Sequence, residues 1–201
     1  MFDLDRFIAD CRGALTESAP QLAVKELIDR AVSRPAEVEK TLGTPEWAGI
    51  GTLHRSPELT ILNIVWAPCM QLYPHDHRMW AVIGLYGGRE DNLFYRRTPE
   101  GLARAGSKEL EAADAILLGK TVIHSVTNPL RQFTGAIHVY GGDFFGVPRS
   151  EWDPETLRER AYDVERAKGV FAEANERFRA EQASGEPPKG PCLTPESPRD
   201  A

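Results

Sequence analysis

The first part of the chain places apolar side chains three and four positions apart, the spacing of one face of an α-helix. Pro20 and Pro35 each follow a break in this spacing, and proline is well tolerated in a first helical turn. The pattern predicts a helical segment over residues 1–43 that packs on the following domain, its third, short helix ending at Gly43. The two longer stripes contain Phe2, Leu4, Phe7, Ile8, Cys11 and Leu15, then Leu22, Val24, Leu27, Ile28 and Ala31.

From about residue 44 the pattern changes to short, apolar and β-branched runs that are separated by glycine and proline. Such runs at regular intervals are typical of strands in an all-β sandwich or barrel. The segments between them are too short for crossover helices, so a parallel α/β sheet is not expected. Residues 44–150 are therefore predicted to form one β-barrel, with strands near residues 59–66, 80–86, 92–97, 115–118, 121–124 and 136–140.

The last part of the chain begins with a helix-start pattern. Asp153 is a candidate N-cap, Pro154 suits the first helical position, and Glu155 adds negative charge to the first turn. We therefore expect a C-terminal helix over residues 151–182. Residues 183–201 are rich in proline and poor in apolar side chains, which predicts a disordered tail.

Composition narrows the class of protein. A hydrophobic fraction of 41% with 27% charged residues is typical of a soluble globular chain. No apolar run approaches the roughly 20 residues of a transmembrane helix, and the first residues lack a signal-peptide pattern. The net charge of −6 provides no basic surface for nucleic acid, so neither a membrane nor a nucleic-acid partner is expected. Three scattered cysteines do not make a disulfide framework, which favours a reducing cytoplasm, and Cys69 is interpreted as a small buried hydrophobic side chain without a redox role.

The histidines are the candidates for chemistry. His75 and His77 are two residues apart, so on a strand both imidazoles project from the same face and can occupy adjacent positions on one metal ion. A third ligand must come from elsewhere, and His124, at the end of an apolar strand, is the best candidate. The alternative is that these histidines are ordinary core or surface residues, because a His-x-His pattern is short.

The segments around these histidines resemble the two signature motifs of the cupin superfamily. The run Pro74–His77 with Gly88 downstream is similar to the first motif, and His124 with Asn128 four residues later is similar to the second. The resemblance covers about residues 59–145. It implies a mainly β fold, a double-stranded β-helix (cupin) barrel with N-terminal helices and a C-terminal helix.

Cupins supply a glutamate ligand in the first motif, but Ala81 and Val82 occupy that position here. A cupin with three histidines and no glutamate resembles the thiol dioxygenases, and Trp66 also fits that group. The resemblance implies Fe(II), or another divalent metal, on the three histidines, and a reaction of a small thiol with O2 that gives a sulfinic acid. It also implies His138 and Tyr140 as catalytic residues, with Tyr140 donating a hydrogen bond to the oxygen reactant while His138 positions it.

The chain departs from this group at two places. Ala136 stands where the family has a serine beside the catalytic histidine, and Thr134, on the same strand face, is a possible substitute. No arginine aligns with the one that binds the substrate carboxylate in the family, so the substrate-binding candidates are Arg55, Arg78 and Met79. The thiol is therefore left open between 3-mercaptopropionate-like and cysteine-like compounds.

Three neutral imidazoles leave a divalent ion with its full charge, which favours binding of an anionic thiolate. Two other functions use the same residues. A zinc-type enzyme would activate a bound water for hydrolysis. A non-catalytic cupin would only bind a small ligand, since one fold hosts many functions. The sequence carries no signal for an oligomeric state.

Overall fold

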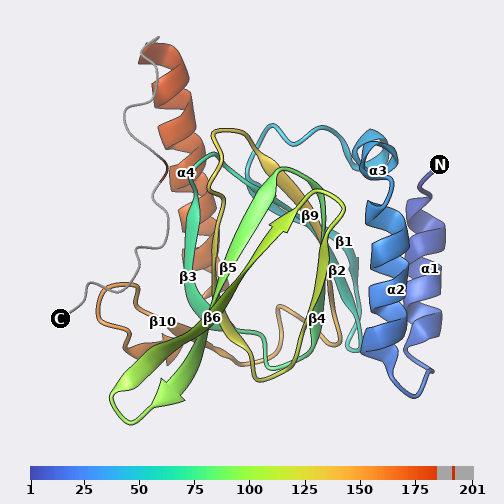
Figure 1. The fold of residues 1–201 in the computed structure, drawn as a ribbon, viewed down its shortest axis with the longest axis horizontal. Helices are drawn as coiled ribbons and strands as arrows, with labels where there is room; N and C mark the ends of the chain where they lie inside the picture. The colour runs from blue at the N-terminus through green and yellow to red at the C-terminus, as the bar shows by residue number, and fades with distance from the viewer. Residues whose placement is uncertain (185–191, 193–201) are drawn as a thin grey trace.

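A computed structural model describes residues 1–184 and Cys192 (Figure 1). The predicted disordered tail therefore lies, beyond residue 184 and apart from Cys192, outside the described residues. Within the described part, helices stand at both ends of the chain and strands fill the middle, as the hydrophobic pattern predicts. None of the described helices is both long enough and apolar enough to span a bilayer.

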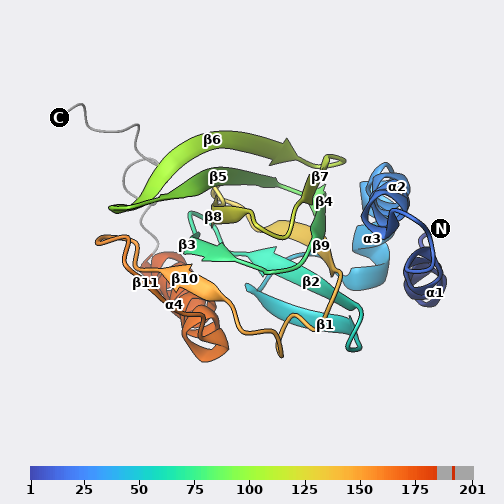
Figure 2. The ribbon, with the colours of Figure 1, turned by 90° about the horizontal axis from the view of Figure 1, so that it is seen from below.

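The N-terminal helices form a layer on the outside of one sheet (Figure 1, Figure 2). They are α1 (Leu4–Ala14), α2 (Pro20–Val32) and α3 (Pro35–Leu42). Asp3 caps α1 by accepting a hydrogen bond from the backbone N–H of Arg6. Prolines start α2 and α3, as expected from their fixed backbone angle.

The strands form two antiparallel sheets that face each other. The first has the order β1-β2-β9-β4-β7, and the second has the order β11-β10-β3-β8-β5-β6. Strands far apart in sequence thus become neighbours, which is the double-sheet arrangement of a cupin-type β-barrel. The strands are β1 (Gly49–Arg55), β2 (Thr60–Trp66), β3 (Gln71–Asp76), β4 (Ala81–Gly87), β5 (Arg89–Thr98), β6 (Gly101–Glu111), β7 (Ala115–Leu118), β8 (Ile123–Thr127), β9 (Thr134–Tyr140), β10 (Ser150–Trp152) and β11 (Glu159–Ala161).

The central strands of the first sheet, β2, β9 and β4, are buried on both faces. Leu62 and Ile64 of β2 point into the barrel, whereas Ile61 belongs to the cluster under the helices. This double burial explains why the strand has an unbroken apolar run rather than an alternating one. The helices come close to the sheet at Gly84 of β4, where a Cβ atom would overlap the side chain of Ile28 on α2. Glycine at this position therefore permits the helical layer to dock.

The C-terminal helix begins later than its sequence pattern indicates. Asp153 does accept a hydrogen bond from the backbone N–H of Thr156. The turn ends at Leu157, however, because its φ of +52° is not a right-handed helical angle. The turn instead links β10 to β11, and the helix α4 (Val164–Ser184) is capped by Asp163. The prediction of a helix starting near residue 153 was wrong because an isolated capped turn also suits a hairpin connection.

Helix α4 packs against the barrel at the side away from α1 and α2 (Figure 1, Figure 2). The ring of Phe171 stacks on Trp66 with centroids 5.2 Å apart. The Asn175 side chain also bonds the backbone N–H and C=O of Ala48, each at 2.9 Å. These contacts bring α4 to the edge of the barrel interior.

A disulfide joins Cys69 to Cys192, and Cys11 is a buried free thiol. The interpretation of Cys69 as a small buried hydrophobic side chain was therefore wrong, because Cys69 is half-buried and forms a disulfide. The two cysteines are 123 residues apart in sequence, and only the folded chain brings their Cα atoms to 4.9 Å.

The disulfide makes a direct prediction about thiol content. Protein purified without reductant and then denatured should release one equivalent of thiol to a chromogenic reagent, from Cys11, and three after reduction. Three equivalents before reduction would contradict the disulfide. A Cys11→Ser variant is the control, because it should give none before reduction and two after it.

Candidate metal centre

His75, His77 and His124 converge inside the barrel, as the sequence pattern indicates. His75 is at the end of β3, directly opposite His124 in β8, and His77 follows one residue after β3 ends. One ligand nitrogen from each ring lies within 4.8 Å of the other two, and all three side chains are buried. Among the described residues, no other group of three or more histidine, cysteine or acidic side chains is placed to hold a metal ion.

Hydrogen bonds on the far side of two rings aim their remaining nitrogens at one another. The Nδ1 of His75 is 3.0 Å from the carbonyl oxygen of Tyr73, and the Nδ1 of His124 is 2.7 Å from Oδ1 of Asn92. Both partners are acceptors, so the ring protons are on Nδ1 and the Nε2 lone pairs face the cluster. The Nε2 atoms of His77 and His124 are 3.4 Å apart. Two nitrogens bound to one ion at about 2.0–2.1 Å would be separated by about 3.0–3.4 Å, so the donor set fits a metal.

Burial keeps these imidazoles neutral. It lowers the pKa of His75 to about 4 and holds the pKa values of His77 and His124 well below their ordinary value. Neighbouring imidazoles lower the pKa values of His77 and His124 further, because each additional proton would repel the others. A neutral imidazole is the form that binds metal, so the environment prepares all three rings as ligands.

A small cavity adjoins the three histidines. Its free space is about 20 Å³, which is room for about one water molecule. The walls are apolar or aromatic, apart from the ligand rings, His138 and two tyrosine hydroxyls. A substrate therefore needs some side-chain movement to enter, and it would then be shielded from bulk water. The apolar part of the wall includes Ile64, Trp66, Leu72, Val126, Phe144 and Phe171.

His138 and Tyr140, the predicted catalytic pair, both line this cavity. The Nδ1 of His138 is 3.0 Å from the Tyr140 hydroxyl, and the Tyr140 ring meets the His77 ring edge to face, with centroids 5.0 Å apart. Burial raises the pKa of Tyr140 above its ordinary value, so its hydroxyl stays protonated. Thr134 does not replace the missing serine, because its hydroxyl bonds the backbone of Arg89 instead.

The predicted substrate-binding residues lie elsewhere. Arg55 is exposed and forms an ion pair with Asp143 at 2.8 Å. Arg78 is exposed in a turn with φ +58°, which directs it to Asp76. Met79 is buried, but it packs in the core and is not among the residues that line the cavity. The structure brings none of these three residues to the cavity wall.

Arg149 is the arginine that sequence reasoning missed. It is 7% exposed, and its guanidinium carbon lies 4.0 Å from the ring centroid of Phe144 and 3.8 Å from that of Tyr162. Both rings line the cavity, whereas Arg149 packs against these rings and is not itself a lining residue. One nitrogen donates to the carbonyl of Phe144, whereas Nε and Nη2 are buried without a partner. Its charge also lowers the pKa of His75 and His77, which places it within electrostatic reach of the ligands.

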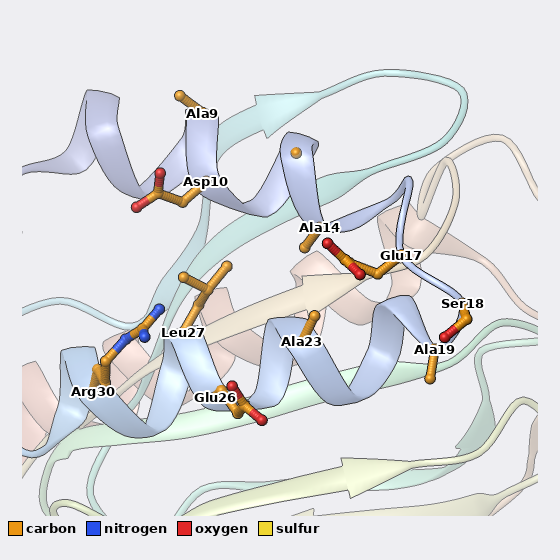
Figure 3. A pocket seen from close by; sticks show the side chains of 11 residues that line it. Ala9, Asp10, Ala14, Glu17, Ser18, Ala19, Ala23, Glu26, Leu27 and Arg30 are labelled. Carbon is orange, nitrogen blue, oxygen red and sulfur yellow. The ribbon is translucent and has the colours of Figure 1, made fainter.

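A surface hollow of about 660 Å³ lies between α1 and α2 (Figure 3). Asp10, Glu17 and Arg30 are at its rim, among small side chains. Its lining contains no histidine and no cysteine. The hollow lies on the helical layer, and the histidine cluster lies within the barrel, so the two are separate features.

No protein-family model matches the chain. The chain has limited similarity to several solved structures. An RmlC-like cupin family protein with a double-stranded β-helix fold, from Methanocaldococcus jannaschii, is 10% identical, with 51% of this chain and 86% of that chain covered and a TM-score of 0.43. A variant of the oxalate decarboxylase of Bacillus subtilis is 14% identical, with 44% and 22% covered and a TM-score of 0.37. KdgF from a Halomonas species is 16% identical, with 46% and 76% covered and a TM-score of 0.38.

The strand order assigns the fold independently of these similarities. The chain is a mainly β protein whose two antiparallel sheets form a cupin-type barrel, with helices at both ends and a buried three-histidine group that could hold a metal ion.

Proposed function

We propose that this chain is a metal-dependent cupin enzyme, an Fe(II) thiol dioxygenase that acts on a small anionic thiol. In the overall reaction R–SH and O2 give R–SO2H, so both oxygen atoms end on sulfur, which is oxidised while O2 is reduced. The observation that carries the proposal is the convergence of three neutral imidazoles without a carboxylate in the group. When bound there, Fe(II) would supply open coordination positions and the redox chemistry that joins O2 to a thiolate sulfur.

The charge of the site favours an anionic substrate. The three ligand rings contribute no negative charge, and Arg149 adds a positive charge nearby. Two of its nitrogens are buried donors without acceptors, and buried unpaired donors are costly. A substrate carboxylate could accept from both, since guanidinium groups bind carboxylates in a fork. These features support a thiol with a carboxylate a few bonds away, such as 3-mercaptopropionate or cysteine.

The other wall residues hold the reactants. Phe144, Trp66 and Phe171 exclude water from the cavity. The Tyr140 hydroxyl hydrogen-bonds the reactants, and His138 holds that hydroxyl in place through the 3.0 Å bond. Bringing two reactants together in a dry, fixed geometry supplies most of the acceleration in this proposal.

The proposal is tested by oxygen uptake. Protein loaded with Fe(II) without air should consume O2 with 3-mercaptopropionate or cysteine, form the sulfinate, and be less active with cysteamine, whose amine lacks the carboxylate. Metal-free protein and protein loaded with Zn(II) are the controls. Iron-loaded protein that takes up no O2 with any of the three thiols would contradict the proposal.

The role of Tyr140 gives a separate prediction. Tyr140→Phe removes one hydroxyl from the cavity and should lower turnover about tenfold, the value of one hydrogen bond of roughly 1–1.5 kcal/mol. Iron content should stay the same, because the hydroxyl is not a ligand. Turnover equal to that of the unchanged protein would remove this role. Tyr95→Phe, which removes a hydroxyl bonded to Ser125 outside the cavity, is the matched control.

A further inference from the structure

Glu90 is a buried carboxyl group with no role in the reaction proposed above. It is fully buried, and it comes from β5 in the second sheet. His138 and Tyr140 come from β9 in the first sheet. Glu90 therefore reaches across the barrel interior. An isolated buried carboxylate is costly, so its partners indicate what it does.

Three nitrogen atoms surround the two oxygens of Glu90. The indole Nε1 of Trp66 donates to Oε2 at 2.8 Å, and the amide of Asn92 donates to Oε1 at 2.9 Å. The Nε2 of His138 lies 3.8 Å from Oε2 and is buried with no other partner. A shift of several tenths of an ångström would complete a third hydrogen bond to the carboxylate.

We propose that Glu90 is a positioning residue that fixes the ring tautomers of His124 and His138 at the same time. When Glu90 is ionised, its two oxygens accept hydrogen bonds only, so each neighbouring group has to present an N–H to it. One carboxylate thereby connects a candidate metal ligand to the histidine that holds Tyr140.

The first connection passes through Asn92. Because the NH2 of Asn92 is directed to Glu90, its Oδ1 faces His124, which is 2.7 Å away. The His124 proton is then held on Nδ1, and its Nε2 lone pair is free for a metal. Partners of this kind behind a ligand histidine typically change metal affinity by about 10- to 100-fold when they are removed.

The second connection passes directly to His138. With its proton on Nε2 toward Glu90, the ring has an Nδ1 lone pair that accepts the Tyr140 hydroxyl at 3.0 Å. Tyr140 then presents an oxygen lone pair to the cavity and accepts a hydrogen bond from the entering thiol, before the thiol loses its proton, rather than donating one to the oxygen reactant. This consequence rests on the proposed function, whereas the tautomers do not. Glu90 thus faces Nε2 of His138, the histidine to which Ala136 offers no hydroxyl group.

Nuclear magnetic resonance can test the tautomers without any turnover. The probe is the zinc-loaded protein with 15N-labelled histidine, whose ring correlation spectra show which nitrogen carries the proton. Burial raises the pKa of Glu90 to about 7, so spectra recorded at pH 8.5 report the carboxylate. We expect the proton on Nε2 in His138 and on Nδ1 in His124.

The variant Glu90→Gln keeps the size of the side chain but has only one acceptor oxygen. It cannot accept from both Trp66 and Asn92, so His138 should move its proton to Nδ1, or Zn(II) affinity should fall about 10- to 100-fold, or both. Glu109→Gln is the matched control, since it is the same kind of substitution at an exposed glutamate of β6 that pairs with Arg89. It should change Zn(II) affinity by less than about twofold, as surface changes usually do.

A proton on Nδ1 of His138 in the unchanged protein would overturn the proposal, and so would a Glu90→Gln variant with the original tautomers and the original Zn(II) affinity. The position of the His138 proton in the unchanged protein tests the proposal even if the Glu90→Gln variant does not fold. Neither measurement depends on O2 or thiol, so a chain that shows no dioxygenase activity can still pass both.

Discussion

His124→Ala is expected to remove tight binding of divalent metal. Structural sites bind Zn(II) with roughly 10–16 kcal/mol, so one of three nitrogen donors is worth about 3–5 kcal/mol, or roughly 10²- to 10⁴-fold in affinity. His124 is also the donor that comes from a separate strand, and without it only the His75 and His77 pair at one strand end remains. Competition with a chromogenic chelator measures the Zn(II) affinity, and elemental analysis measures the iron content.

The matched control for that substitution is His54→Ala. His54 is in β1, outside the cluster, so its loss should leave the affinity for Zn(II) unchanged. A His124→Ala protein that binds Zn(II) as tightly as the unchanged protein would show that the three histidines do not form a metal site. Because removal of a buried ring also leaves a void, thermal unfolding of both variants should be recorded to separate loss of ligand from loss of fold.

The sequence predicts best those elements whose apolar residues recur at one regular spacing. The N-terminal helices have apolar stripes and prolines at their starts, and both signals are local. Strand β6 (Gly101–Glu111) was not predicted, since most of its residues are exposed and it has no apolar alternation. It is held by pairing with β5 through the whole of its length, and such a partner is invisible in a hydrophobic pattern.

The same distinction applies to the site. His75 and His77 could be placed together because a strand has a two-residue period, and His124 was added from its strand and from a family resemblance. Arg149 and Glu90 gave no such signal. Arg149 follows a loop, and what matters is that the fold buries it between two aromatic rings. Glu90 lies in the polar start of β5, ahead of Leu93 and Phe94, and its contact with His138 comes from the opposite sheet.

Arg149→Met is expected to lower kcat/KM for 3-mercaptopropionate by roughly 10- to 150-fold, which corresponds to about 1.5–3 kcal/mol for hydrogen bonds to a charged group. Methionine keeps most of the apolar contact with Phe144 and Tyr162 and removes the charge. The loss should be much smaller for a neutral thiol such as 2-mercaptoethanol, because it has no carboxylate to bind. For cysteamine the rate should rise, since the variant no longer repels its ammonium group.

The ratio of these rates separates a substrate-binding arginine from a structural one. A purely structural role would lower the rates with all three thiols together, because Arg149 also bonds the carbonyl of Phe144 in the cavity wall. Arg96→Met, which removes an exposed arginine, is the control and should change none of the rates. An Arg149→Met protein with an unchanged preference for the anionic thiol would contradict the carboxylate role, whereas unchanged iron content would show that the metal ligands are intact. The carboxylate would then have to be bound by the metal site alone, without a guanidinium partner.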